Sequence, residues 1–295
     1  MKKILVFGGA GLVGSKFIEL FSHKFQFLAP DISEIDILNK DQVSKTFEQF
    51  NPDTVINFAA ITNVEEAENQ KQSKEGICFR VNAIGAKNIA EVCKSFDKHL
   101  IHISTEYVFD GAKAESPYSE EDKPNPINWY GQTKLFGEQF VLESGCFGVI
   151  IRICMPFSSF YDLKKDVARF FLDKLKSGSE ITAIEDQNIT PTSVSDIAHA
   201  LALVADTKTR GLYHVCSKNS TSPYKFAQLI AQSFNLNASL IKPISFDEYN
   251  RGKKAKLLRN SWMDSAKFTQ EKGPEILHRI EESILLFKKT VDERE

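Results

Sequence analysis

A glycine-rich turn near the amino terminus constrains the fold of this chain more than any other feature. Gly8, Gly11 and Gly14 follow an apolar run at residues 4–7 and open a segment, residues 12–21, with helical spacing of apolar side chains. In a strand–turn–helix unit such glycines permit a tight turn, close approach of a pyrophosphate and close helix–strand packing. The phosphates then meet the unpaired N–H groups at the start of the helix. The turn therefore predicts a dinucleotide site, with a purely structural turn as the alternative. The residues assigned to it are Gly8, Gly11, Leu12 and Val13.

Short apolar runs alternate with helical patterns through the first half of the chain. We expect strands at residues 4–7, 25–29, 54–60, 100–104 and 149–153. We expect helices at residues 12–21, 41–50, 81–96 and 130–143. Apolar strands separated by amphipathic helices are typical of a parallel sheet with both faces covered. The pattern predicts an α/β fold with a doubly wound parallel sheet of the Rossmann type.

The second half is less regular and predicts a smaller C-terminal substrate-binding cap. We expect helices over residues 162–176, 193–205, 223–234 and from 274 onward, and strands over 180–184 and 211–216. The chain then divides into a dinucleotide-binding domain at residues 1–155 and a mainly substrate-binding cap at 156–295. Residues 190–216 or so are expected to return to the first domain.

Composition excludes several classes of protein. With 37 Lys and Arg against 39 Asp and Glu, the net charge is −2, which argues against binding to nucleic acid or membrane surfaces. No apolar run approaches the ~18 residues of a membrane span. Five scattered cysteines without a C-x-x-C pair are typical of reduced thiols in the cytoplasm. No histidine or cysteine spacing predicts a metal site. We expect a cytoplasmic protein, and a homodimer is one arrangement that the sequence leaves open.

Acidic residues after the second expected strand bear on the choice of cofactor. Asp31 lies 17 residues after Gly14, where a carboxylate can accept hydrogen bonds from the adenosine ribose. No Lys or Arg occurs between Gln26 and Asn39, so no nearby cation awaits a 2′-phosphate. The cofactor is therefore NADH or NADPH, with NADH favoured. Asp36 and Ile37 are expected to face the adenine. The alternative for Asp31 is a loop carboxylate, and the alternative for Asp36 is a helix cap.

A tyrosine and a lysine four residues apart predict the catalytic centre. Tyr130 and Lys134 lie on one face of the expected helix over residues 130–143. A neighbouring cation lowers the pKa of a phenol and makes it a better acid–base catalyst at neutral pH. The strand before this helix ends in Ser104 and Thr105, so a hydroxyl group can reach the same crevice. Together these groups suit carbonyl reduction or alcohol oxidation.

Several stretches carry a resemblance to a known family. They are residues 52–60 (PDTVINFAA), 104–111 (STEYVFDG), 117–120 (PYSE), 130–138 (YGQTKLFGE) and 211–214 (GLYH). Nearly end to end, the chain resembles the extended short-chain dehydrogenase/reductases and, among them, the dTDP-4-dehydrorhamnose reductase family.

The resemblance implies a reaction and roles for named residues. In that family, hydride passes from a nicotinamide to C4 of a 4-keto-6-deoxy sugar attached to a nucleoside diphosphate. By similarity, Tyr130 would protonate the alkoxide, Thr105 would hydrogen-bond the carbonyl oxygen, and Lys134 would tune Tyr130 and anchor the cofactor ribose. The remaining implied contacts are Ala59 and Ala60 with the cofactor, and Glu106, Tyr107 and Met155 with the substrate.

The chain also departs from the family pattern. Glu106 replaces the usual aspartate, Met155 replaces a tryptophan, and Phe157 replaces a tyrosine. Ahead of Asn260-Ser261, Leu257-Leu258-Arg259 stands where the family has Arg-Pro. These changes leave the cofactor half intact and bear on the identity of the sugar. A catalytically weak NAD(P)-binding regulatory subunit, similar to the methionine adenosyltransferase β-subunit, remains an alternative. A sugar-nucleotide epimerase or dehydratase is a third.

Overall fold

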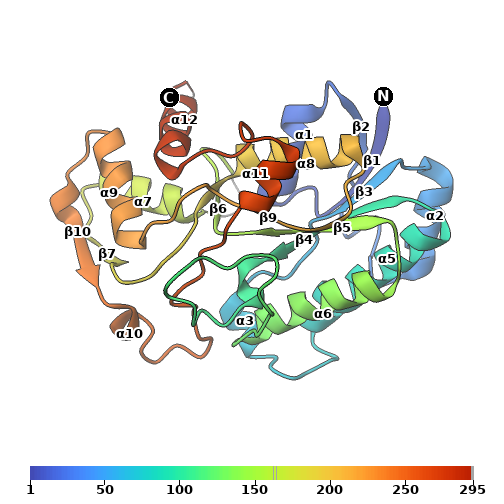
Figure 1. Ribbon diagram of the computed structural model, residues 1–295, viewed down its shortest axis with the longest axis horizontal. Coiled ribbons are helices and arrows are strands. Elements are labelled where there is room, and N and C mark those ends of the chain that lie inside the picture. Colours follow the sequence, from blue (N-terminus) through green and yellow to red (C-terminus); the bar gives the residue numbers. More distant parts are fainter. Residues whose placement is uncertain (162, 164, 294–295) are drawn as a thin grey trace.

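A six-stranded parallel sheet forms the centre of the computed structural model, which describes residues 1–161, 163 and 165–293. Its spatial order is β2-β1-β3-β4-β5-β9, so the direction of strand order reverses between β1 and β3 (Figure 1). Ligands of doubly wound sheets bind at such a reversal, beyond the carboxyl ends of the strands. The strands are β1 (Lys2–Phe7), β2 (Phe25–Leu28), β3 (Thr54–Asn57), β4 (His99–Thr105), β5 (Gly148–Ile153) and β9 (Gly211–Val215).

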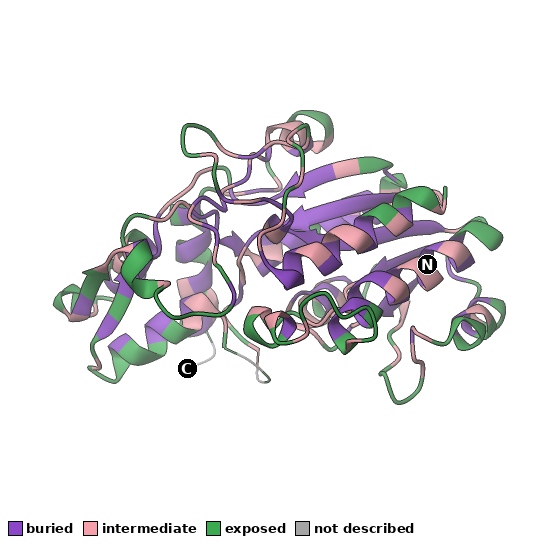
Figure 2. Ribbon diagram, turned by 90° about the horizontal axis from the view of Figure 1, so that it is seen from below, coloured by how far each residue is buried: buried purple, intermediate pink, exposed green. Residues whose placement is uncertain are grey.

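Helices cover both faces of this sheet, which confirms the predicted fold class. Alternate side chains of β1 show the cause: Ile4 and Val6 enter one core, and Leu5 and Phe7 enter the other. The first core is covered by α1 (Leu12–Phe21) and α8 (Val194–Thr207), and the second by α2 (Lys40–Phe50), α5 (Ala86–Ser95) and α6 (Trp129–Glu143). Burial on both faces explains the near-continuous apolar strands of the sequence (Figure 2).

A second lobe has its own apolar core. It holds two pairs of parallel strands, β7 with β10 and β6 with β8. Its elements are β6 (Pro156–Phe157), α7 (Val167–Lys176), β7 (Ile181–Ile184), β8 (Thr192–Ser193), α9 (Pro223–Ser233), β10 (Ile241–Ile244), α10 (Phe246–Tyr249) and α12 (Ile280–Asp292). Between these segments, α8 packs against α1 and β9 joins β5 in the large sheet.

Several elements differ from the sequence expectations. The helix expected over residues 81–96 is split, because residues 80–85 form a π-helical turn, η1 (Arg80–Gly85), before α5 begins. The strand expected over 54–60 ends at Asn57, whose side-chain oxygen accepts a hydrogen bond from the amide of Ala59. The helix expected over 162–176 begins at Val167 after its cap, Asp166, and residues 162 and 164 lie outside the described residues.

Short helices complete the chain. They are α3 (Val64–Glu68), α4 (Ile77–Phe79), η2 (Glu106–Val108), η3 (Ala238–Leu240) and α11 (Ala266–Lys272). The sequence did not predict α11, which packs on β9 through Phe268 and brings a late segment back to the large sheet. Among the described helices, none has the length and apolar character needed to cross a membrane.

Candidate active site

The glycine turn has the geometry that a dinucleotide requires. Gly8 has a φ of 75°, and a Cβ atom there would lie 2.6 Å from the amide nitrogen of Ala59. Gly11 is the N-cap of α1 and brings no side chain to the first N–H groups of that helix. These N–H groups are therefore free to bind an anion at the positive end of α1. The turn fits a pyrophosphate, and any side chain at Gly8 would collide with the backbone of Phe58 and Ala59.

The segment after β3 lies directly beside this turn. Ala59 and Ala60 follow the end of β3, and Asn57 fixes their direction by accepting the Ala59 amide at 3.1 Å. Asn82, on η1, clamps the same segment one residue further on. Its side chain accepts the amide of Ile61 at 2.8 Å and donates to the carbonyl of Ile61 at 3.0 Å. The buried side-chain amides of Asn57 and Asn82 therefore hold the segment in which the sequence predicts cofactor contacts.

Asp31, Asp36 and Ile37 lie beyond the carboxyl end of β2. The carboxylate of Asp31 accepts the amide of Ser33 at 3.0 Å, and these hydrogen bonds lower the pKa of this exposed group. Asp36 forms a similar turn with the amide of Leu38, at 2.9 Å. The alternative of a helix cap at Asp36 is wrong, because Asn39 caps α2. Ile37 is buried and packs over Gly85, which limits its contact with an adenine.

The three residues predicted to be catalytic lie close together where β4 meets α6. Thr105 ends β4, and Tyr130 and Lys134 lie on the first two turns of α6, all three buried. Asn128 starts this helix by accepting the amide of Gly131 at 2.9 Å. A Cβ atom at Gly131 would come within 2.0 Å of the Tyr107 carbonyl oxygen. Glycine at this position therefore lets α6 approach the segment that follows Thr105.

Burial changes the acid–base properties of this trio. Desolvation, followed by the charge of Glu106, raises the pKa of Tyr130, although a hydrogen bond with Thr105 lowers it. The sequence predicted the opposite direction, through Lys134. Desolvation also lowers the pKa of Lys134 to about 8, against the opposing charge of Glu138. Tyr130 therefore keeps its proton at neutral pH.

Glu106 lies next to these groups in a buried pocket. The Thr105 hydroxyl donates a 2.6 Å hydrogen bond to Oε2 of Glu106. Desolvation raises the pKa of Glu106 to about 7, opposed by hydrogen bonds that include the Met155 amide. Met155 adopts a φ of 38°, an uncommon value for a residue other than glycine. This backbone strain accompanies an amide that points at the carboxylate.

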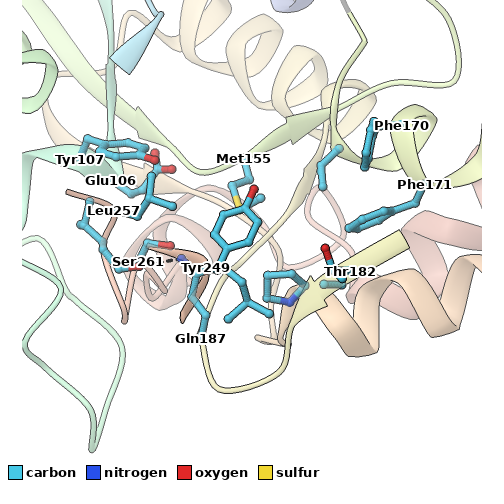
Figure 3. Close-up of a pocket in the computed structure, with 15 residues that line it drawn as sticks. Glu106, Tyr107, Met155, Phe170, Phe171, Thr182, Gln187, Tyr249, Leu257 and Ser261 are labelled. Carbon is cyan, nitrogen blue, oxygen red and sulfur yellow. Dashed lines mark hydrogen bonds between the residues drawn. The ribbon is translucent and has the colours of Figure 1, made fainter. Parts of the chain in front are cut away.

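A cavity of about 230 Å³ opens beside Glu106 between the two lobes. Figure 3 shows Glu106 and Tyr107 at one side of it, Phe170 and Phe171 at the other, and Met155 between them. All three predicted substrate contacts therefore line one cavity. Among the residues that the structure describes around it, none is Lys or Arg.

Other lining residues were missed from the sequence. They are Val167, Phe170, Phe171, Thr182, Ala183, Ile184, Gln187, Pro223, Tyr249, Leu258 and Ser261. Phe170 and Phe171 lie in the helix expected over residues 162–176, and local spacing does not separate a pocket wall from a core. Leu257 also lines the cavity, and its departure from the family pattern was the signal for it. Arg259, two residues later, is turned away into ion pairs with Asp186 and Asp247.

The fold and this site define a class of protein. The reversed strand order, the glycine turn and the trio of Thr105, Tyr130 and Lys134 together form an extended short-chain dehydrogenase/reductase. The family model "RmlD substrate binding domain" matches residues 1–285, and the chain belongs to this family.

Known relatives cover nearly the whole chain. A dTDP-4-dehydrorhamnose reductase of Aggregatibacter actinomycetemcomitans is 31% identical over 286 residues, which span 92% of this chain and 94% of that protein. The methionine adenosyltransferase 2 subunit beta of Bos taurus is 28% identical over 83% of this chain and 75% of that one. The crystal structure of a dTDP-4-dehydrorhamnose reductase from Bacillus anthracis in complex with NADP has a TM-score of 0.89 at 29% identity, covering 98% of this chain and 100% of that chain.

Proposed function

We propose that this protein is an NAD(P)H-dependent reductase that converts the 4-keto group of a nucleotide-linked 4-keto-6-deoxy sugar into an alcohol. One observation carries the proposal: Thr105 and Tyr130 converge beside Glu106, which lines a cavity between the two lobes. A hydroxyl and a phenol at that point suit a carbonyl oxygen that gains negative charge. The similarity to dTDP-4-dehydrorhamnose reductases over more than nine-tenths of the chain supports the same reaction.

A nicotinamide dinucleotide fits the first domain. Its pyrophosphate would lie at Gly8 and Gly11, against the amino terminus of α1, and its nicotinamide near Ala59 and Ala60. Bound there, the cofactor supplies the hydride. Lys134, whose Nζ atom is held at the carbonyl of Ile103 on β4, would donate hydrogen bonds to the ribose hydroxyls. The NADP complex of the Bacillus anthracis relative supports this assignment.

We expect NADH to bind at least as well as NADPH. The pKa of Asp31 is lowered by its hydrogen bonds to Ser33, so the side chain is charged at neutral pH. A 2′-phosphate on the adenosine ribose would face this charge. The segment from residue 27 to residue 38 supplies no Lys or Arg to offset it.

The residues of the chain divide the chemistry among them. Thr105 would turn its hydroxyl proton from Glu106 toward the substrate carbonyl, donate a hydrogen bond there and polarise the carbonyl toward attack. Tyr130 gives its proton to the oxygen as negative charge develops there. Burial favours this step because it raises the pKa of Tyr130. The phenol therefore stays protonated until negative charge develops on the substrate oxygen. The nearby ammonium of Lys134 then stabilises the phenolate.

The experiment is a spectrophotometric assay of NADH and NADPH oxidation with a panel of nucleotide-linked 4-keto-6-deoxy sugars. Product analysis should show an alcohol at C4. We expect turnover with at least one member of the panel, in the range of about 1–10³ s⁻¹ that is usual for enzymes. Tight cofactor binding without turnover of any sugar would contradict the proposal. The catalytically weak cofactor-binding subunit, the alternative drawn from the methionine adenosyltransferase relatives, would then replace it.

A further inference from the structure

Three acid–base groups lie in series at the edge of the cavity. The Tyr130 phenol lies close enough to the Thr105 side chain for that side chain to lower its pKa, and the Thr105 hydroxyl donates to Oε2 of Glu106 at 2.6 Å. Glu106 lines the cavity, whereas Thr105 and Tyr130 are not among its lining residues. The series therefore runs from the reacting phenol to the space that admits substrate.

Tyr130 loses a proton in each reduction and must regain it before the next. The Tyr130 ring is buried, between Tyr107 in an edge-to-face contact and the body of α6. The ammonium of Lys134 is also buried and donates to the Ile103 carbonyl at 2.7 Å. Of the described groups near Tyr130, Glu106 is the carboxyl group that lines the cavity.

We propose that Glu106 returns a proton to Tyr130 through the Thr105 hydroxyl after each reduction. This inference rests on the proposed reductase function and adds a role that the substrate contact alone does not require. Glu106 would act through Thr105 and not directly on the sugar carbonyl.

The transfer balances without any further reagent. After the reduction, Tyr130 carries a phenolate and Glu106 a protonated carboxyl. The Thr105 hydroxyl gives its proton to the phenolate oxygen and takes the carboxyl proton of Glu106 in the same movement. Tyr130 and Thr105 are then neutral hydroxyls, and Glu106 is a carboxylate. Water in the cavity reprotonates Glu106, and the proton consumed overall is the one found on the product alcohol.

The surroundings of Glu106 suit such a carrier. The titratable groups that face it are Tyr107 from η2, Tyr130 from α6 and Cys154 after β5, and burial raises the pKa of each one. These neighbours are therefore uncharged at neutral pH and leave the charge of Glu106 unpaired. Desolvation raises the pKa of Glu106 to about 7, so the carboxyl both holds and releases a proton near neutral pH. The Met155 amide keeps it in place.

The test separates the first turnover from the later ones in Glu106→Gln, which keeps the size of the side chain and cannot release a proton. Enzyme in excess over substrate should reduce it at close to the wild-type rate, because Tyr130 starts protonated. Steady-state kcat should fall by about 10²-fold, the lower end of acid–base effects. Wild-type kcat should decline as pH rises through about 7, and this decline should vanish in the variant.

Glu120→Gln is the matched control, because Glu120 is a partly buried carboxyl that accepts the His214 amide away from the cavity. It should keep the wild-type kcat and pH profile. An equal loss of first-turnover rate and kcat in Glu106→Gln would overturn the relay, and so would an unchanged kcat.

A failure of the proposed reductase function can be distinguished from a failure of the Glu106 relay. If the wild-type protein reduces no sugar, infrared difference titration of the cofactor-bound protein decides the inference. A carboxylic acid band that titrates near pH 7 in the wild type, is lost in Glu106→Gln and is shifted in Thr105→Val would support a proton-sharing pair. A Glu106 that is fully ionised at pH 6 would overturn it.

Discussion

The Nζ atom of Lys134 donates a 2.7 Å hydrogen bond to the carbonyl oxygen of Ile103, on the neighbouring strand β4. The ammonium is thereby tied to the sheet rather than to the phenol of Tyr130, one helical turn earlier. Burial then dominates the ionisation of Tyr130 and raises its pKa. In the protein without ligands, Tyr130 is therefore a proton donor and not a phenolate.

Replacement of Tyr130 by phenylalanine should remove most of the turnover and little of the cofactor binding. The ring and its edge-to-face contact with Tyr107 would remain, while the proton donor would be lost. We expect kcat to fall by about 10²–10⁴-fold. The first turnover should fall as much as the steady-state rate, unlike in Glu106→Gln. Fluorescence titration with NADH checks the binding, and unchanged activity would remove Tyr130 from the mechanism.

The positions of Gly8, Thr105 and Tyr130 in the fold could be predicted because the signals for them are local. Each of these residues lies where a strand ends or a helix begins, and parallel strands bring their carboxyl ends to one edge. The residues of the cavity wall were harder to predict from the sequence. Phe170 and Tyr249 come from distant segments of the second lobe and meet by tertiary packing alone.

Backbone details also escaped the sequence. Met155 adopts a positive φ between the end of β5 and the start of β6, and no local sequence pattern predicts it. The π-helical turn at η1 places Asn82 against both Ile61 and Thr133, through contacts that depend on the packing of α6. The direction of the Tyr130 pKa shift was wrong for a related reason: burial cannot be measured from a four-residue spacing.

The affinity for the two cofactors should depend on Asp31. We expect the wild-type protein to bind NADH at least as tightly as NADPH, because the charged carboxylate opposes a 2′-phosphate. Asp31→Asn should strengthen NADPH binding relative to NADH, and calorimetric titration would measure both dissociation constants. Asp36→Asn is the control, since it removes the same charge from a neighbouring turn. A strong wild-type preference for NADPH would show that Asp31 does not oppose the 2′-phosphate.

Acid should destabilise the fold through His214. This buried ring lies 3.5 Å from a nitrogen of Arg152, and desolvation followed by that charge lowers its pKa to about 3. The unfolded chain takes up the proton near pH 6.5, so the stability is present above that pH and is lost as pH falls toward 3. At pH 5 the loss from His214 is about 2 kcal/mol.

Urea unfolding at pH 7 and pH 5 measures this effect. His214→Gln should be less stable at pH 7 and less sensitive to the change in pH, because glutamine does not titrate. His199→Gln, on an exposed part of α8, should keep the wild-type sensitivity. Equal sensitivity in wild type and His214→Gln would assign the acid effect to other groups.

The identity of the sugar should depend on Met155. A tryptophan offers a rigid apolar face and an N–H donor, and a flexible thioether offers neither. The cavity should therefore discriminate weakly among nucleotide-linked 4-keto sugars, with the dTDP-rhamnose precursor a poor substrate. Met155→Trp should raise kcat/KM for that precursor by about 10–100-fold, as expected for one contact worth 1–3 kcal/mol. Efficient reduction of the precursor by the wild-type protein would contradict this.

Binding of the diphosphate should respond to Leu257. This residue lines the cavity where the family pattern has arginine, and the cavity wall described here carries the Glu106 carboxyl and no cation. Arg259 does not substitute for the missing charge, because its guanidinium is paired with Asp186 and Asp247. Leu257→Arg should lower KM for nucleotide-linked sugars by about 10-fold, the effect of one charge-assisted contact of ~1.5 kcal/mol. The gain should shrink as salt is raised, since partly exposed charges are screened.

Leu257→Met is the uncharged control and should leave KM and its salt dependence unchanged. An equal KM in the arginine and methionine variants would show that the diphosphate is held elsewhere, and Lys253, Lys254 and Lys256 would be the next residues to replace.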